Sequence, residues 1–114
     1  MAIGKVNGPV HTYQALRELT HASHRALALA ERADPTSARF EAWQLETARL
    51  IGRIFGFNSP YARAFNDLFY EYRGGRPELS LLEQAHCFDR GMVAARALLE
   101  EMRRDLQEAE RAAL

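Results

Sequence analysis

Residues 80–114, SLLEQAHCFDRGMVAARALLEEMRRDLQEAERAAL, carry the longest uninterrupted helical pattern in the chain. Apolar residues recur there at spacings of three and four, which is the period of one face of an α-helix. Ser80 and Glu83 stand just before this run in the S-x-x-E pattern that caps a helix N-terminus. The pattern predicts a helix of about 30 residues, roughly 45 Å long. Its expected inward face is Leu81, Ala85, Phe88, Met92, Ala95, Leu99, Met102, Leu106, Ala109 and Ala113.

The rest of the chain is divided by proline into stretches that also have helical periodicity. Proline is tolerated in or just before a first helical turn, where its missing N–H has no intrahelical partner. We therefore expect helices over about 9–32 and 38–55, and a third that starts at Ser59-Pro60 and stops at Gly74-Gly75. The dividing residues are Pro9, Pro35, Pro60 and Pro77.

Each of these three helices has one apolar stripe that should face a common core. The expected stripes are Leu16, Leu19, Ser23, Leu27 and Ala30 in the first helix, Phe40, Trp43, Thr47, Ile51 and Ile54 in the second, and Tyr61, Phe65, Leu68 and Tyr72 in the third. No stretch alternates apolar and polar residues as a strand would. The sequence predicts an all-α four-helix bundle over residues 9–114, with a flexible N-terminus at 1–8 and a long, overhanging C-terminal helix.

Composition excludes several classes of protein. The 114 residues are enough for one domain, and 47% of them are apolar, as in a globular protein with a real core. Fifteen basic residues balance fifteen acidic ones, so nucleic acid is not the expected partner. Cys87 is the only cysteine and cannot form an internal disulfide, and no run is apolar enough to span a bilayer. We expect a cytoplasmic protein that needs no cofactor.

A doubled E-x-x-H pattern is one candidate for chemistry. Glu18 with His21 and Glu83 with His86 repeat the spacing that supplies metal ligands in ferritin-like di-metal bundles. Both pairs lie about 140–160° from the apolar stripes of their own helices, so we expect them to face water. Glu83 also has a capping role. A di-metal carboxylate bundle is therefore the weakest of the functional alternatives.

A second candidate is an Arg followed at some distance by His in RELTHASH, residues 17–24. Arg17 and His24 are compatible with the signature of HEPN-type ribonucleases, which are small helical dimers. That resemblance implies that the two residues orient the ribose 2′-hydroxyl and the phosphate across a dimer cleft, with His as acid or base. In those enzymes the signature usually lies later in the bundle. The alternative is a solvated helix face.

A contact surface for another chain is the third candidate. Leu29, Leu45 and Tyr70 each point about 140–180° away from the expected core face of their helix. The charged tail of the last helix keeps Met102 and Leu106 in phase, which a solvated helix does not need. We expect these five residues to contact a protein partner, such as a second copy of the chain in a homodimer.

The segments 40–69, FEAWQLETARLIGRIFGFNSPYARAFNDLF, and 88–106, FDRGMVAARALLEEMRRDL, resemble a helical module at the N-terminus of bacterial conflict-system (defence) proteins. The shared features are Trp43, Ile54-Phe55-Gly56, Ser59, Phe65 and Gly91. Such modules precede TIR-like or nuclease-like effectors, and the resemblance implies an oligomerisation or sensing role without catalytic residues. We therefore expect a non-catalytic interaction module, a subunit of a defence complex, with the ribonuclease as the alternative.

Overall fold

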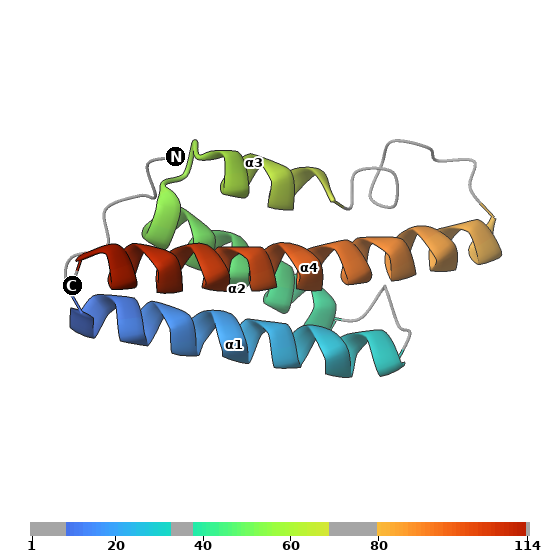
Figure 1. Cartoon of the computed structure of the whole chain (residues 1–114). Coiled ribbons are helices and arrows are strands. Elements are labelled where there is room, and N and C mark those ends of the chain that lie inside the picture. Colours follow the sequence, from blue (N-terminus) through green and yellow to red (C-terminus); the bar gives the residue numbers. More distant parts are fainter. Residues whose placement is uncertain (1–8, 33–37, 69–79, 114) are drawn as a thin grey trace.

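Four helices make up the part of the chain that the computed structural model describes, which is residues 9–32, 38–68 and 80–113. They are α1 (Pro9–Arg32), α2 (Ala38–Phe55), α3 (Pro60–Asp67) and α4 (Leu81–Ala113) (Figure 1). No strand occurs within these three segments. The all-α fold and the long C-terminal helix are confirmed. The predicted flexible segment 1–8 and Gly74-Gly75 lie outside the described residues. Helix α3 ends at Asp67 with Leu68 as its C-cap, earlier than the predicted stop at Gly74-Gly75.

Local sequence explains where the helices begin and end. The Ser59 hydroxyl accepts the Ala62 N–H at 3.2 Å and caps α3, with Pro60 in the first turn. Gly56 ends α2 with φ of 104°, a left-handed conformation that favours glycine. At α4, the Glu83 N–H donates to the Ser80 hydroxyl at 3.2 Å, and the Ser80 N–H donates back to the Glu83 carboxylate at 3.3 Å. The predicted capping box is confirmed.

The centre of the core is aromatic and joins α2, α3 and α4. Trp43 is fully buried, and its ring lies 6.1 Å from that of Phe40 and 5.7 Å from that of Phe65. Phe40 in turn meets Phe88 of α4 edge to face at 5.0 Å. All five residues of the predicted α2 stripe are buried. These ring contacts place α2 at the centre of the core, with one contact to α3 and one to α4.

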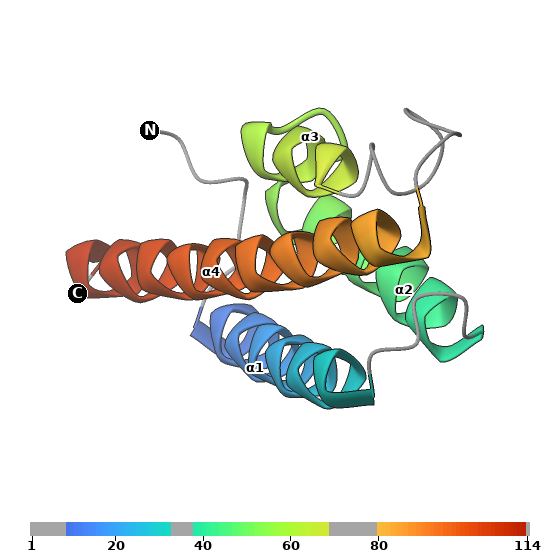
Figure 2. The same ribbon diagram turned by 90° about the vertical axis from the view of Figure 1, so that its right-hand side faces the viewer.

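Two polar contacts connect α1 with α2 and α3 with α4. The indole N–H of Trp43 donates to the backbone carbonyl of Ala22 in α1 at 2.9 Å, which satisfies a buried donor. The Tyr61 hydroxyl of α3 donates to the Asp105 carboxylate of α4. Burial, followed by the hydrogen bond and the negative charge of Asp105, raises the pKa of Tyr61 above its ordinary value. Figure 2 shows α3 and α1 on different sides of α4.

The inward face of α1 differs from the predicted one. Leu27 was expected inside but is 40% exposed, whereas Leu29 was expected outside but is only 9% exposed. The buried face consists mostly of small residues: Thr12, Ala15, Leu19, Ala22, Ala26 and Leu29. Alanines allow α1 to lie close to the long helix α4, and this close packing outweighs the burial of one more leucine. The stripe expected from the large residues is therefore rotated relative to the real one.

The structure also corrects the prediction of which end of α4 overhangs the bundle. Met102 and Leu106 were expected on a protruding tail, but both are 0% exposed. Helices α1 and α4 run antiparallel, so the C-terminal half of α4 lies beside α1, and the first turns of α4 extend past the described end of α1 (Figure 1). The tail stripe is therefore part of the chain's own core.

Candidate functional site

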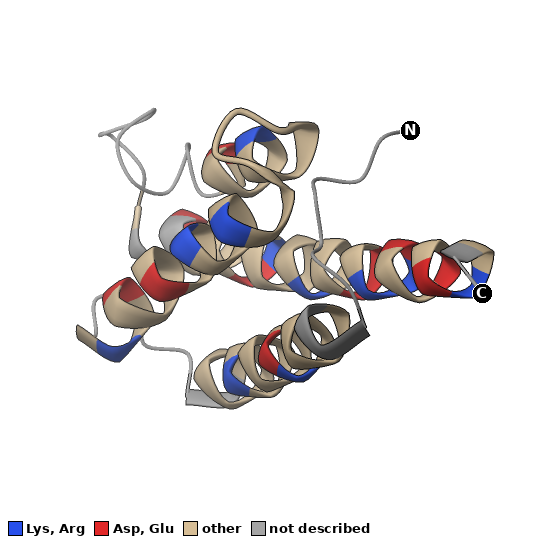
Figure 3. Cartoon of the chain, turned by 90° about the vertical axis from the view of Figure 1, so that its left-hand side faces the viewer, with Lys and Arg blue, Asp and Glu red and all other residues tan. Residues whose placement is uncertain are grey.

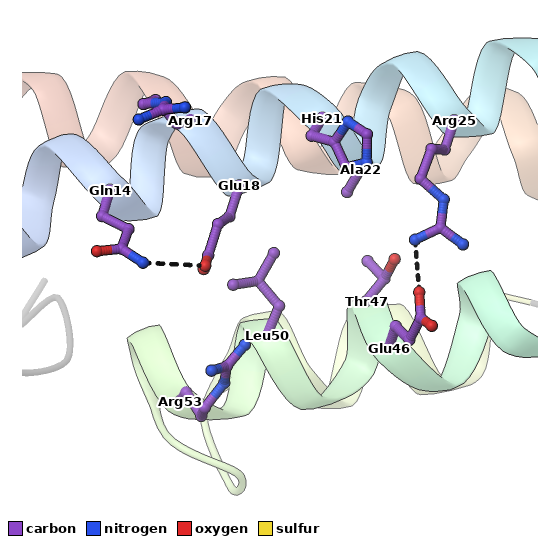
Figure 4. A pocket seen from close by; sticks show the side chains of 10 residues that line it. All are labelled: Gln14, Arg17, Glu18, His21, Ala22, Arg25, Glu46, Thr47, Leu50 and Arg53. Atoms are coloured by element: carbon purple, nitrogen blue, oxygen red, sulfur yellow. Dashed lines mark hydrogen bonds and ion pairs between the residues drawn. The ribbon is translucent and has the colours of Figure 1, made fainter.

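An open groove with a volume of about 550 Å³ lies between α1 and α2. Figure 4 shows the two helices on opposite sides of it. They can line one groove because they run antiparallel: Arg25 of α1 faces Glu46 of α2, and Gln14 lies at the same end as Arg53. The lining residues are Gln14, Arg17, Glu18, His21, Ala22, Arg25, Glu46, Thr47, Leu50 and Arg53.

The floor of the groove is buried and largely apolar. Ala22, Thr47 and Leu50 line it and are 5%, 2% and 6% exposed. Thr47 directs its hydroxyl toward α1 (Figure 4). Directly beneath, the hydrogen bond from Trp43 to the Ala22 carbonyl holds the two helices together. The floor therefore belongs to the core, and the rim side chains are the more exposed part of the groove.

The rim is charged, and much of its charge is neutralised within the chain. Arg25 and Glu46 form an ion pair at 2.5 Å across the groove, with side chains 35% and 57% exposed. The Gln14 amide donates to the Glu18 carboxylate at 3.4 Å. Three arginines against two glutamates leave a formal charge of +1, since 3 − 2 = 1, with His21 neutral. Guanidinium groups bind carboxylates and phosphates well. The two glutamates weaken this preference, so the groove suits small ligands of either charge.

The predicted ribonuclease pair is exposed on α1 but is not gathered into this groove. Arg17 lines the groove, and its guanidinium carbon lies 5.9 Å from the centre of the Tyr13 ring. His24 is exposed and is not a lining residue. The histidine beside Arg17 in the groove is His21. Residues 17 and 24 are seven apart and therefore within about 20° on the helix, so both could meet a second chain on the same side.

The two E-x-x-H pairs lie on different helices, as the sequence requires. Glu18 and His21 line the groove, while Glu83 and His86 are exposed in the first turns of α4, where Glu83 forms the capping box. In the segments 9–32, 38–68 and 80–113, no three His, Cys, Asp or Glu side chains come close enough to hold a metal ion.

The five predicted contact residues differ in where the structure places them. Leu45 is 54% exposed on the outer side of α2, where the sequence placed it. Leu29, Met102 and Leu106 are 9%, 0% and 0% exposed, so they pack inside the bundle and are corrected to core residues. Tyr70 lies outside the described residues.

Sequence reasoning missed most of the large apolar residues that are exposed. Besides Leu45, these are Tyr13 at 64%, Leu27 at 40%, Phe57 at 65%, Leu82 at 69% and Val93 at 68%. A signal was present for Leu82 and Val93, because eleven residues correspond to about 20° of rotation and place both on one line along α4. Phe57 follows the end of α2, and no periodic pattern predicts its direction.

Comparison with protein-family models, with curated proteins and with solved structures finds no match to this chain. None of the helices in the described segments has the length and apolar character needed to cross a membrane. The residues and their arrangement are therefore the basis for the functional proposal.

Proposed function

We propose that this chain is a non-catalytic helical module for protein–protein interaction that assembles as a homo-oligomer. The observation that supports it is the set of six large apolar side chains that are at least 40% exposed, in a domain whose helices otherwise bury their apolar stripes. Single exposed apolar residues are common on protein surfaces, but Leu82 and Val93 lie on one line along α4, as expected of a contact site. Leu45 is the member of this set that the sequence had placed in contact with a partner.

The proposed setting is a cytoplasmic bacterial defence complex of which the chain is a subunit. Its support is the resemblance carried by residues 40–69 and 88–106. A protein is the proposed partner, because fifteen basic and fifteen acidic residues give no net attraction to nucleic acid. Figure 3 shows both signs of charge interspersed on the helices.

The test is the molar mass of the purified chain in solution, measured by light scattering and sedimentation from about 1 µM to about 1 mM. The expected result is a mass that rises with concentration from one chain to two. A chain that stays monomeric over the whole range would reject self-assembly. Circular dichroism on the same samples shows whether the sample is folded, so that aggregation is not mistaken for assembly.

A ribonuclease remains the second candidate, and one observation favours it. Arg17 and His24 are both exposed and lie on one side of α1, where a twofold-related chain could bring two pairs together. A labelled RNA incubated with the dimeric protein should then be cleaved, and His24→Ala should abolish cleavage while His21→Ala leaves it. Intact RNA would remove this candidate, and equal cleavage by the His24→Ala variant would assign the activity to a contaminant.

A further inference from the structure

One line of residues along α4 is unusually exposed for a helix in the middle of a bundle. Leu82 and Val93 are 69% and 68% exposed, and they lie about 20° apart around the helix axis. Asp89 lies between them and is also exposed. We call Leu82, Asp89, Val93 and Arg96 the outer row of α4.

The outer row lies on a side of α4 that faces away from α3. Asp105 fixes the side that faces α3, since it accepts the hydrogen bond from Tyr61. Val93 lies about 120° from the buried Leu99 in the direction opposite to Asp105. In both Figure 1 and Figure 2, α4 has one side along which no other described helix lies.

Two arginines near this row have polar atoms that lack an acceptor. The Nε atoms of Arg96 and Arg103 are buried and make no hydrogen bond, although Nη1 of Arg103 pairs with Glu100. These Nε atoms are covered by the chain itself, so a carboxylate of a partner would reach the two arginines at their terminal guanidinium nitrogens. The nearest residue of this kind in the outer row is Asp89, but it is seven positions from Arg96 along the helix and so about 10 Å away.

Two residues of the outer row, Asp89 and the half-buried Arg96, carry opposite charges on either side of Val93. Asp89 stands four residues before Val93, and Arg96 stands three residues after it. In an antiparallel pair of identical helices with a twofold axis beside Val93, Asp89 of one chain therefore lies opposite Arg96 of the partner subunit, and the reverse pair forms by symmetry. The same register places Leu82 against the aliphatic part of Arg103 of the partner subunit.

We propose that the outer row of α4 is a homodimer interface in which two copies of this chain pair α4 antiparallel about an axis at Val93. This inference rests on the proposed function and adds the surface, the symmetry and the register. A second copy fits better than an unrelated partner of uniform charge, because such a partner would attract one end of the row and repel the other. The interface is narrow and largely polar, so the dimer should be weak and sensitive to salt.

The decisive experiment is charge reversal with mixing, followed by sedimentation. Asp89→Arg alone and Arg96→Asp alone each replace two attractive pairs by two repulsive pairs, so each variant should dimerise about thirtyfold more weakly than wild type. An equimolar mixture of the two variants restores both attractive pairs and should recover the wild-type affinity as a heterodimer. Arg49→Asp, the same change at an exposed position on α2, is the matched control and should dimerise as wild type does.

A second measurement tests the axis itself. In a Cys87→Ser background, Val93→Cys should form an intermolecular disulfide under mild oxidation, whereas Leu45→Cys, on α2, should not. This interface is wrong if the protein dimerises but neither charge reversal changes the affinity, or if a disulfide forms at position 45 and not at position 93. Either result leaves the proposed function standing. A monomeric wild type overturns both.

Discussion

Replacing Trp43 with phenylalanine tests the packing on which the fold and the groove depend. Trp43 is 0% exposed, donates its indole N–H to the Ala22 carbonyl at 2.9 Å, and packs against the rings of Phe40 and Phe65. The lost hydrogen bond contributes about 1 kcal/mol, and the smaller ring leaves a void and weaker ring contacts that add about 1–3 kcal/mol. We expect the free energy of unfolding to fall by about 2–4 kcal/mol.

Thermal unfolding followed by far-UV circular dichroism measures this change. For a domain of this size, the expected loss corresponds to a fall in Tm of about 10–20 °C. Tyr13→Phe is the matched control, because Tyr13 is an aromatic residue of α1 that is 64% exposed, and its replacement should change the stability by less than about 0.5 kcal/mol. A Tm for Trp43→Phe within about 3 °C of wild type would refute the buried, hydrogen-bonded position of the indole.

Three further predictions follow from buried contacts. The pKa of Tyr61 is raised in the folded chain, so the stability that Tyr61 contributes is present below about pH 10 and is lost as the pH rises above that value. In urea unfolding, Tyr61→Phe should therefore lose less stability than wild type at alkaline pH. An unchanged pH dependence would contradict the contact between Tyr61 and Asp105. A Cβ at Gly52 would lie 2.2 Å from the Phe57 ring. Gly52→Ala should therefore raise the free energy of unfolding by about 1 kcal/mol only when Phe57→Ala is also present. An equal effect in the wild-type and Phe57→Ala backgrounds would show that the ring does not cover Gly52. Met102→Glu places a carboxylate in the core and should unfold the domain. A circular dichroism spectrum of a folded variant would show that Met102 is not a core residue.

The helix bounds and the inward face of α2 could be predicted from sequence because their signals are local. Caps such as Ser59 and Ser80 act on backbone groups a few residues away, and they work in any tertiary setting. The α2 stripe is also unambiguous, because its large residues, including Phe40 and Trp43, fall on one side of the helix. Both the caps and the stripe depend only on residues within one turn or one helix.

The candidate groove could not be predicted in the same way, because it exists only where two helices meet. The sequence singled out Arg17 with His24, whereas the groove contains Arg17 with His21 and two residues of α2, Arg53 and Glu46. Those partners lie more than 20 residues away from Arg17 along the chain, and no spacing rule connects them. Which histidine faces the groove is decided by the rotation of α1, and that rotation is set by how closely α4 approaches.

The rotation of α1 also determines what the domain exposes. An amphipathic helix normally turns its largest apolar residues inward, because each buried leucine contributes about 1.5–3 kcal/mol. Helix α1 instead turns Ala15, Ala22 and Ala26 inward and leaves Leu27 40% and Tyr13 64% exposed. Small side chains let the backbones of α1 and α4 approach and gain dispersion contacts along several turns, which offsets the loss from one half-exposed leucine. The consequence is that two bulky residues of α1, Leu27 and Tyr13, remain exposed although the smaller alanines beside them are buried.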